Sequence, residues 1–195
     1  ADATSVSTDQ LTLLGRTTPD LYQHVFRYAF QQSFFLEPLL NPDGFRGDRS
    51  PSEQPLAHEI TVGVRGQESF DRRLIPTQQQ IVGGFFTVRG YPEALASGDN
   101  AIIGTAEYAF HLGRAFPVAV SNAAPNLFGQ PFRVSRAVPY GTADWDLIFR
   151  TFFDVAHLRQ SDPLSFEDEQ TLLGTGVGVE VRFRSNVSAR LDYGI

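Results

Sequence analysis

Residues 82–93 read VGGFFTVRGYPE, and the rest of the chain is most simply interpreted as a set of strands arranged around this segment. The glycines at positions 83 and 84 permit tight or positive-φ backbone, and a run of β-branched and aromatic residues follows them. A single arginine, Arg89, then stands between Val88 and Gly90. The pattern predicts a loop that presents one guanidinium group at a defined point.

Segments of alternating polarity flank this loop on both sides. Residues 58–66 are among the clearest, because Ile60, Val62 and Val64 fall on one parity while Glu59, Thr61 and Arg65 fall on the other, which is the period of a β-strand. The same period recurs in five further segments: 21–31, 100–112, 146–157, 173–184 and 187–195. The sequence therefore predicts an all-β chain of about six antiparallel strands. A long connection, rich in proline, glycine and asparagine, is expected at about 113–145.

The polar parity of these strands carries most of their charge. Its charged members are Arg65, Glu107, Arg150, Asp154, Glu180, Arg182, Arg190 and Asp192. A dry protein core would not accept these groups, whereas a water-filled lumen or a solvent-exposed face would. The alternation fits a transmembrane barrel with apolar side chains toward lipid, and it also fits a soluble antiparallel sandwich.

Composition narrows the functional classes. The chain of 195 residues has no cysteine, which excludes a disulfide framework and thiolate metal sites. All 16 basic residues are arginine, and the formal charge of −6 gives no support to a nucleic-acid-binding surface. No apolar run reaches the roughly 18 residues of a membrane-spanning helix, although a mean hydropathy of −0.18 is also what barrel strands produce.

Catalytic and metal sites are not predicted. The four histidines are dispersed and are interpreted as strand or interface residues: His24, His58, His111 and His157. Glu167, Asp168 and Glu169 are expected to form a solvated acidic loop rather than a calcium site. The glycines at 83 and 84 do not form a phosphate loop, because no lysine follows them. We therefore expect no enzymatic activity, no cofactor and no metal.

Three motifs carry a resemblance to a known family. The tetrapeptide at 88–91, Val-Arg-Gly-Tyr, resembles the motif of the sixth extracellular loop in outer-membrane β-barrels of the two-partner-secretion (haemolysin activator) family. The superfamily also contains barrel-assembly insertases. Gly104 and Glu107 are similar to a Gly-x-x-Glu element on the following strand, and residues 152–154 match a Phe-x-Asp motif on the strand after that. The resemblance covers most of residues 65–195.

The resemblance implies a set of site residues. The functional loop motif is Val88, Arg89, Gly90 and Tyr91. In the family the loop arginine reaches into the barrel and pairs with the aspartate of Phe-x-Asp, so Phe152 and Asp154 are expected to anchor the loop here. Gly104 and Glu107 would be the supporting strand motif.

The resemblance also implies a fold and a function. It indicates the C-terminal part of a 16-strand transmembrane barrel, with an in-folded loop at about 83–99, strands missing at both ends and no periplasmic domain within 1–195. Its members are outer-membrane pores of Gram-negative-type bacteria, here expected to be monomeric and surrounded by outer-membrane lipids, that secrete an unfolded β-helical partner protein. An assembly insertase and a soluble β-sandwich binding module are the alternatives.

Three glycines share the charged parity of one strand: Gly174, Gly176 and Gly178. Glycine at such positions leaves room for a loop backbone against the wall. A bend or bulge needed for barrel curvature is the other interpretation, and the sequence does not separate the two.

Overall fold

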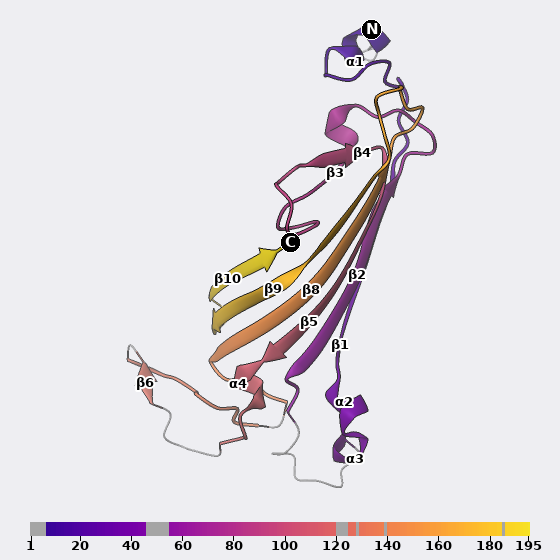
Figure 1. Ribbon diagram of the computed structural model, residues 1–195. Coiled ribbons are helices and arrows are strands. Elements are labelled where there is room, and N and C mark those ends of the chain that lie inside the picture. Colours follow the sequence, from indigo (N-terminus) through magenta and orange to yellow (C-terminus); the bar gives the residue numbers. More distant parts are fainter. Residues whose placement is uncertain (1–6, 46–54, 120–124, 128, 139, 185) are drawn as a thin grey trace.

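Six long antiparallel strands form one twisted sheet in a computed structural model that describes residues 7–45, 55–119, 125–127, 129–138, 140–184 and 186–195 (Figure 1). In spatial order the strands are β1 (Phe26–Phe35), β2 (His58–Glu68), β5 (Asn100–His111), β8 (Trp145–Arg159), β9 (Gln170–Phe183) and β10 (Val187–Gly194). The prediction of about six antiparallel strands is confirmed. Within the described residues β1 and β10 do not pair with each other, so the sheet is not closed.

Short elements occupy the connections. Two small hairpins are formed by β3 (Gln80–Val82) with β4 (Ala96–Gly98) and by β6 (Asn126–Leu127) with β7 (Gln130–Pro131). Among the described residues the helical segments are α1 (Thr8–Thr12), α2 (Glu37–Leu40), α3 (Pro42–Phe45), η2 (Pro76–Gln78) and α4 (Leu112–Ala115). None of the described helices has the length and apolar character required to cross a membrane.

The connections divide between two rims of the sheet. The N-terminal segment, residues 69–99 and residues 160–169 lie at one end, which we call the hairpin rim because the β3–β4 hairpin starts there (Figure 1). The far rim carries α2, α3, α4 and the β6–β7 hairpin. Residues 120–124, 128 and 139 of the expected 113–145 connection lie outside the described residues, and β8 begins at the last position of that range.

The two faces of the sheet differ in chemistry because successive side chains of a strand point in opposite directions. Along β8, Ile148, Phe152 and Asp154 are buried, while Phe149 and Phe153 between them are exposed. We call the first side the hairpin face and the second the open face. Exposed apolar side chains of the open face come from all six strands: Phe26, Tyr28, Phe30, Phe34, Val62, Val64, Ile102, Phe149, Phe153, Leu173, Val177, Val179, Leu191 and Tyr193. A continuous apolar surface of this kind indicates a face that contacts another apolar phase or partner.

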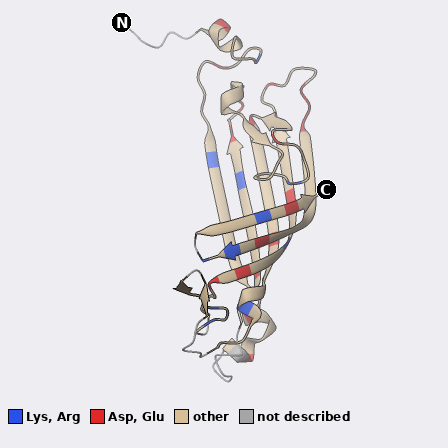
Figure 2. Ribbon diagram, turned by 90° about the vertical axis from the view of Figure 1, so that its left-hand side faces the viewer, with Lys and Arg blue, Asp and Glu red and all other residues tan. Residues whose placement is uncertain are grey.

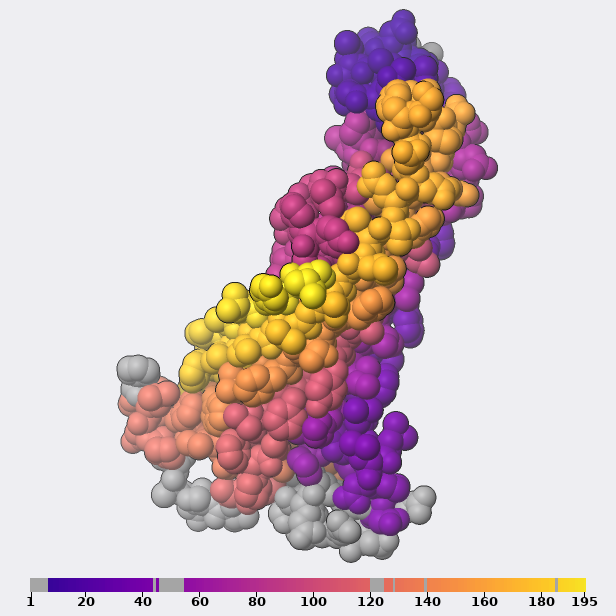
Figure 3. Space-filling view, in the orientation of Figure 1, coloured from indigo at the N-terminus to yellow at the C-terminus, as the bar shows by residue number. Residues whose placement is uncertain are grey.

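The buried core lies between the β3–β4 hairpin and the hairpin face. Residues 80–98 fold back over the sheet, so that the hairpin lies beside the C-terminal residues (Figure 3). The core residues are Val82, Val88 and Ala96 from the hairpin, with Ala101, Ile103, Ala156, Leu158 and Leu172 from the sheet. Val88 has no exposed surface, and burial of such a side chain contributes about 1.5–3 kcal/mol. The hairpin is thus part of the folded unit.

Candidate functional site

The hairpin tip is shaped by two left-handed glycines. Gly83 and Gly84 have φ values of 106° and 92°, a region that favours glycine. The turn is closed by Thr87, whose hydroxyl donates to the carbonyl of Gly83 at 2.8 Å. The amide of Phe85 donates to Glu93 Oε1 at 3.0 Å, which ties the two sides of the tip together. These local bonds orient the chain so that the following segment points toward the sheet.

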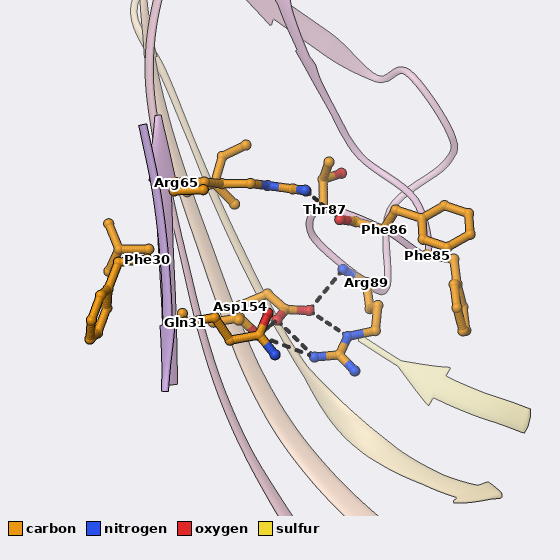
Figure 4. Close-up of a pocket in the computed structure, with 13 residues that line it drawn as sticks. Phe30, Gln31, Arg65, Phe85, Phe86, Thr87, Arg89 and Asp154 are labelled. Carbon is orange, nitrogen blue, oxygen red and sulfur yellow. Dashed lines mark hydrogen bonds and ion pairs between the residues drawn. The ribbon is translucent and has the colours of Figure 1, made fainter. Parts of the chain in front are cut away.

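Arg89 extends from this tip to Asp154 on β8 (Figure 4). Its Nε donates to Asp154 Oδ2 at 2.7 Å and its Nη2 donates to Oδ1 at 2.9 Å. The backbone amide of Arg89 also donates to Oδ2, at 3.2 Å. Paired N–H groups on both oxygens of one carboxylate give strength and direction, and Asp154 is only 1% exposed.

The same guanidinium contacts four further groups, the weakest of these contacts being a bond from Nη2 to the Thr105 hydroxyl at 3.4 Å. Its centre lies 3.6 Å from the ring centroid of Phe152, which is a cation–π arrangement. Nη1 donates to Glu107 Oε2 at 2.7 Å, and Asp192 Oδ2 lies 3.3 Å from the same nitrogen. Arg89 is therefore held by a ring from one side and by carboxylates from three strands.

These contacts belong to a larger charged cluster on the hairpin face. Figure 2 shows charges of both signs along β9 and β10. Its members are the four arginines Arg89, Arg150, Arg182 and Arg190 and the four carboxylates Glu107, Asp154, Glu180 and Asp192. Four positive and four negative groups give a formal charge of zero, and this mutual pairing offsets the cost of removing them from water.

The register of β8 and β9 places a glycine opposite each of three site residues on β8. Gly174 faces Asp154, Gly176 faces Phe152, and Gly178 faces Arg150. A Cβ at position 174 would overlap the carbonyl of Arg89, whereas one at 176 would meet the Phe152 ring and the backbone of β10. At 178 it would meet the carboxylate of Asp192.

Only Gly174 therefore makes room for the loop, and the other two glycines make room for a ring, a carboxylate and the neighbouring strand. The β8–β9 register runs without interruption, and none of the three has a positive φ. A bulge in β9 is thus not what these glycines provide.

The remaining motif residues have structural positions. Val88 is part of the core, and Tyr91 packs against it. Gly90, with φ of 97°, lies against the backbone of Gly194 and Ile195. Glu107 joins the charged cluster, but Gly104 does not, because it points to the open face, where a Cβ would lie 3.1 Å from Val155 Cγ1. The structure thus brings together all the expected anchor residues and leaves one supporting residue outside.

A second polar cluster, at the hairpin rim, was not predicted. Asp99 follows β4 directly and is fully buried. It pairs with Arg16 through both carboxylate oxygens, and it accepts hydrogen bonds from the amides of Leu74 (3.1 Å) and Ser161 (2.9 Å). The N-terminal segment is therefore fastened to the base of the hairpin. The sequence had no signal for this contact, since Arg16 and Asp99 are 83 residues apart.

The expectation of a solvated acidic loop is wrong for Glu167. Its carboxylate accepts bonds from Arg73 Nη1 at 2.6 Å and Nη2 at 2.9 Å, and both side chains are mostly buried. The hydrogen bond from Arg73 lowers the pKa of Glu167 from 4.5 to about 2, against the opposing effect of burial. Asp168 and Glu169 are exposed as expected.

A third cluster lies toward the far rim. His111 is 1% exposed, with Nδ1 at 2.6 Å from Asp146 and Nε2 at 2.9 Å from Glu59. In the part of the chain that the structure describes, no group of three or more histidine, aspartate or glutamate side chains is arranged to hold a metal ion.

The arrangement around Arg89 is suited to holding a loop in one position. The two oxygens of Asp154 are engaged by Arg89 and Thr105, and the charge of each cluster member has an opposite charge within 4 Å. No protein-family model, curated protein or solved structure matches the chain.

Proposed function

We propose that the chain forms part of the wall of an outer-membrane β-barrel pore that secretes an unfolded partner protein. In this proposal the hairpin face lines the lumen, and the β3–β4 hairpin is a loop folded into it and held by Arg89. The observation that carries the proposal is the contrast between the two faces. One face of the six strands has a charged cluster that holds an inserted loop, while the other presents apolar side chains along every strand.

The physical requirements of a membrane support this assignment. Lipid accepts apolar side chains, whereas charged side chains in lipid are costly. The open face fits the first condition, and the charged hairpin face does not suit contact with lipid. Spanning strands need about 9–11 tilted residues, and five of the six strands have ten or more. The unpaired edges of β1 and β10 would be satisfied by the remaining strands of a closed barrel.

The resemblance in three ordered motifs supports the superfamily shared by secretion pores and assembly insertases, and within it we propose secretion, with the insertase as the alternative. A pore for an unfolded chain must hold its loop when closed and reposition it during passage. A network of ion pairs in a wet lumen suits the holding and release of the tip, because its bonds can be exchanged for water. No nucleotide or cofactor is required by this scheme.

A cell-based experiment tests the proposal. The gene with Arg89→Ala is expressed in its native envelope, and the partner is measured in the culture supernatant against the amount of transporter in outer-membrane fractions. We expect secretion to fall at least about tenfold at equal transporter level, since one partner of a buried pair is lost. Arg159→Ala is the matched control, because its exposed side chain lies 3.9 Å from Glu68 at the strand end.

Three results would count against the proposal. A folded monomer that stays in detergent-free buffer would contradict the membrane assignment. Normal secretion by the Arg89→Ala protein would contradict the role of the loop anchor. A defect in outer-membrane protein assembly, with secretion unaffected, would favour the insertase.

A further inference from the structure

A cavity of about 440 Å³ lies between the hairpin tip and the sheet, next to the Arg89–Asp154 pair (Figure 4). Its walls come from β1, β2, β5 and β8 on one side and from residues 85–87 and Arg89 on the other. The volume falls within the range of sites that bind small ligands or short peptide segments. The anchor pair itself is occupied, so any ligand must use the other lining groups.

The first of these groups is an aromatic pair on the hairpin. Phe86 is 79% exposed and Phe85 is 42% exposed, and their rings meet edge to face with centroids 5.1 Å apart. The apolar side chains of the hairpin that are buried, such as Val88, instead face the core. Figure 4 shows both rings on the side of the tip away from β1 and β2, where the Phe85 ring also lies 5.3 Å from the Arg190 guanidinium. A ligand that extends out of the cavity past the tip could place an apolar side chain against them.

The second group is Arg65 on β2, which points from the sheet toward the hairpin tip (Figure 4). Its described hydrogen bond is to the carbonyl oxygen of Phe86, and no described carboxylate lies within ion-pair distance of its guanidinium. The arginines of the charged cluster all have such a partner. With Arg65 and Arg89 against one aspartate, Asp154, the cavity lining carries a formal charge of +1.

We propose that this cavity binds extended polypeptide segments in which a carboxylate side chain neighbours an aromatic or aliphatic one. Arg65 pairs with the carboxylate through N–H groups that the carbonyl of Phe86 leaves unused, and the Phe85–Phe86 pair contacts the apolar side chain. Gln31 and Thr87 line the cavity as hydrogen-bonding groups for the peptide backbone. The inference rests on the proposed function to this extent, that the natural ligand would be the secreted partner.

A binding assay on the full chain in detergent micelles tests the site directly. The probe is a fluorescein-labelled peptide of alternating aspartate and phenylalanine, and fluorescence anisotropy reports binding. We expect Arg65→Gln and Phe86→Ala each to weaken binding about tenfold, as expected for losing a charged hydrogen bond or an aromatic contact. The same peptide with lysine in place of aspartate should bind the unmodified protein no more tightly than the aspartate peptide binds the Arg65→Gln protein.

Arg27→Gln is the matched control. Arg27 lies on β1 with the same parity as Gln31, bonds to Gln67 and Gln78, and does not line the cavity. Equal losses in Arg65→Gln and Arg27→Gln would overturn the inference, because they would show a general effect of positive charge. Tight binding of the lysine peptide, or displacement of the probe by millimolar-range inorganic phosphate alone, would also overturn it.

The binding assay and the secretion experiment test the two proposals separately. Binding that depends on Arg65, in a protein that secretes nothing, would leave the cavity site standing and reject the secretion function. If secretion depends on Arg89 but Arg65→Gln and Phe86→Ala leave peptide binding unchanged, the cavity site alone is rejected.

Discussion

Gly174 faces Asp154 directly across the β8–β9 ladder, and the carbonyl of Arg89 occupies the space that a side chain at position 174 would fill. The backbone of the hairpin tip and Asp154, the carboxylate that pairs with Arg89, therefore lie next to each other on the sheet. Thr105 faces Asp154 from the other side, on β5, and donates its hydroxyl hydrogen to Oδ1 at 2.6 Å. The anchor consists of neighbouring positions on three strands.

Gly174→Ala is expected to displace the hairpin tip. An added Cβ would overlap the backbone of Arg89, which cannot rotate away, and overpacking of this kind costs about 1–3 kcal/mol. Limited proteolysis of membranes should cut within residues 80–98 faster than in the unmodified protein. Gly104→Ala is the control, since its Cβ would meet only a Val155 methyl group. Equal protease resistance in the Gly174→Ala protein would contradict the close contact.

Arg89 and Asp154 are expected to act as one unit. Removing either side chain leaves the other buried and uncompensated, at a cost of about 3–5 kcal/mol before any reduction by nearby water. The double variant should be little worse than either single variant, and denaturant midpoints together with secretion would measure this. Strictly additive losses would show that the two side chains act separately.

Arg89→Lys is expected to resemble Arg89→Ala more than the unmodified protein. Lysine keeps the charge but loses the planar fork that bonds both oxygens of Asp154 and the flat surface that stacks on Phe152. If the proposed function holds, secretion at an unchanged level of the protein is the measurement. Full activity would mean that the site requires only a positive charge.

Arg16→Ala is expected to destabilise the hairpin rim by about 3–5 kcal/mol, because Asp99 would remain as an uncompensated buried charge. Urea unfolding in micelles would measure the loss. Arg72→Ala is the matched control, since its half-exposed side chain lies 3.6 Å from the partly exposed carboxylate of Asp20. Its loss should lower the free energy of unfolding by about 1 kcal/mol or less. Similar midpoints for the two variants would refute a structural role for the Arg16–Asp99 pair.

The Arg73–Glu167 pair predicts a dependence on pH. The pKa of Glu167 is lowered from 4.5 in the unfolded chain to about 2 in the folded one, chiefly by the hydrogen bond from Arg73. A lowered pKa stabilises the folded state above pH 4.5, and that contribution is lost as pH falls from 4.5 toward 2. The amide of Leu164 donates to Glu167 at 2.9 Å. Its hydrogen-exchange rate, corrected for the intrinsic rate, should rise as the pH falls from 4.5 toward 2. Glu167→Gln should abolish the difference, and an unchanged profile in that variant would assign the effect to other carboxylates.

Part of the candidate site could be expected from the sequence. Period-two alternation places Glu107, Arg150 and Asp154 on one face, because the strand geometry alone determines on which side a residue lies. The partnership of Arg89 with Asp154 was expected only through the motif resemblance, since no periodicity connects a loop residue with a strand 65 residues later. Gly104 shows the limit of a motif, because its parity directs it away from Glu107.

The rim contacts were not predictable in the same way. Arg16 lies in a segment without periodicity, and Glu167 in an acidic stretch that looks solvated. Neither contains information about a partner far along the chain. Their burial follows from the meeting of three connections at one end of the sheet.

The sequence by itself determined the strands, their two faces and the loop that carries Arg89, because these depend on residue alternation and on local backbone preference. Only the tertiary structure decided which groups meet. Strand register brings Gly174 opposite Asp154, the fold of the hairpin places Val88 in the core and Phe86 at a cavity, and the rim joins Arg16 to Asp99. Such contacts depend on the alignment of distant strands, and burial then makes each paired charge far more consequential than its position in the chain suggests.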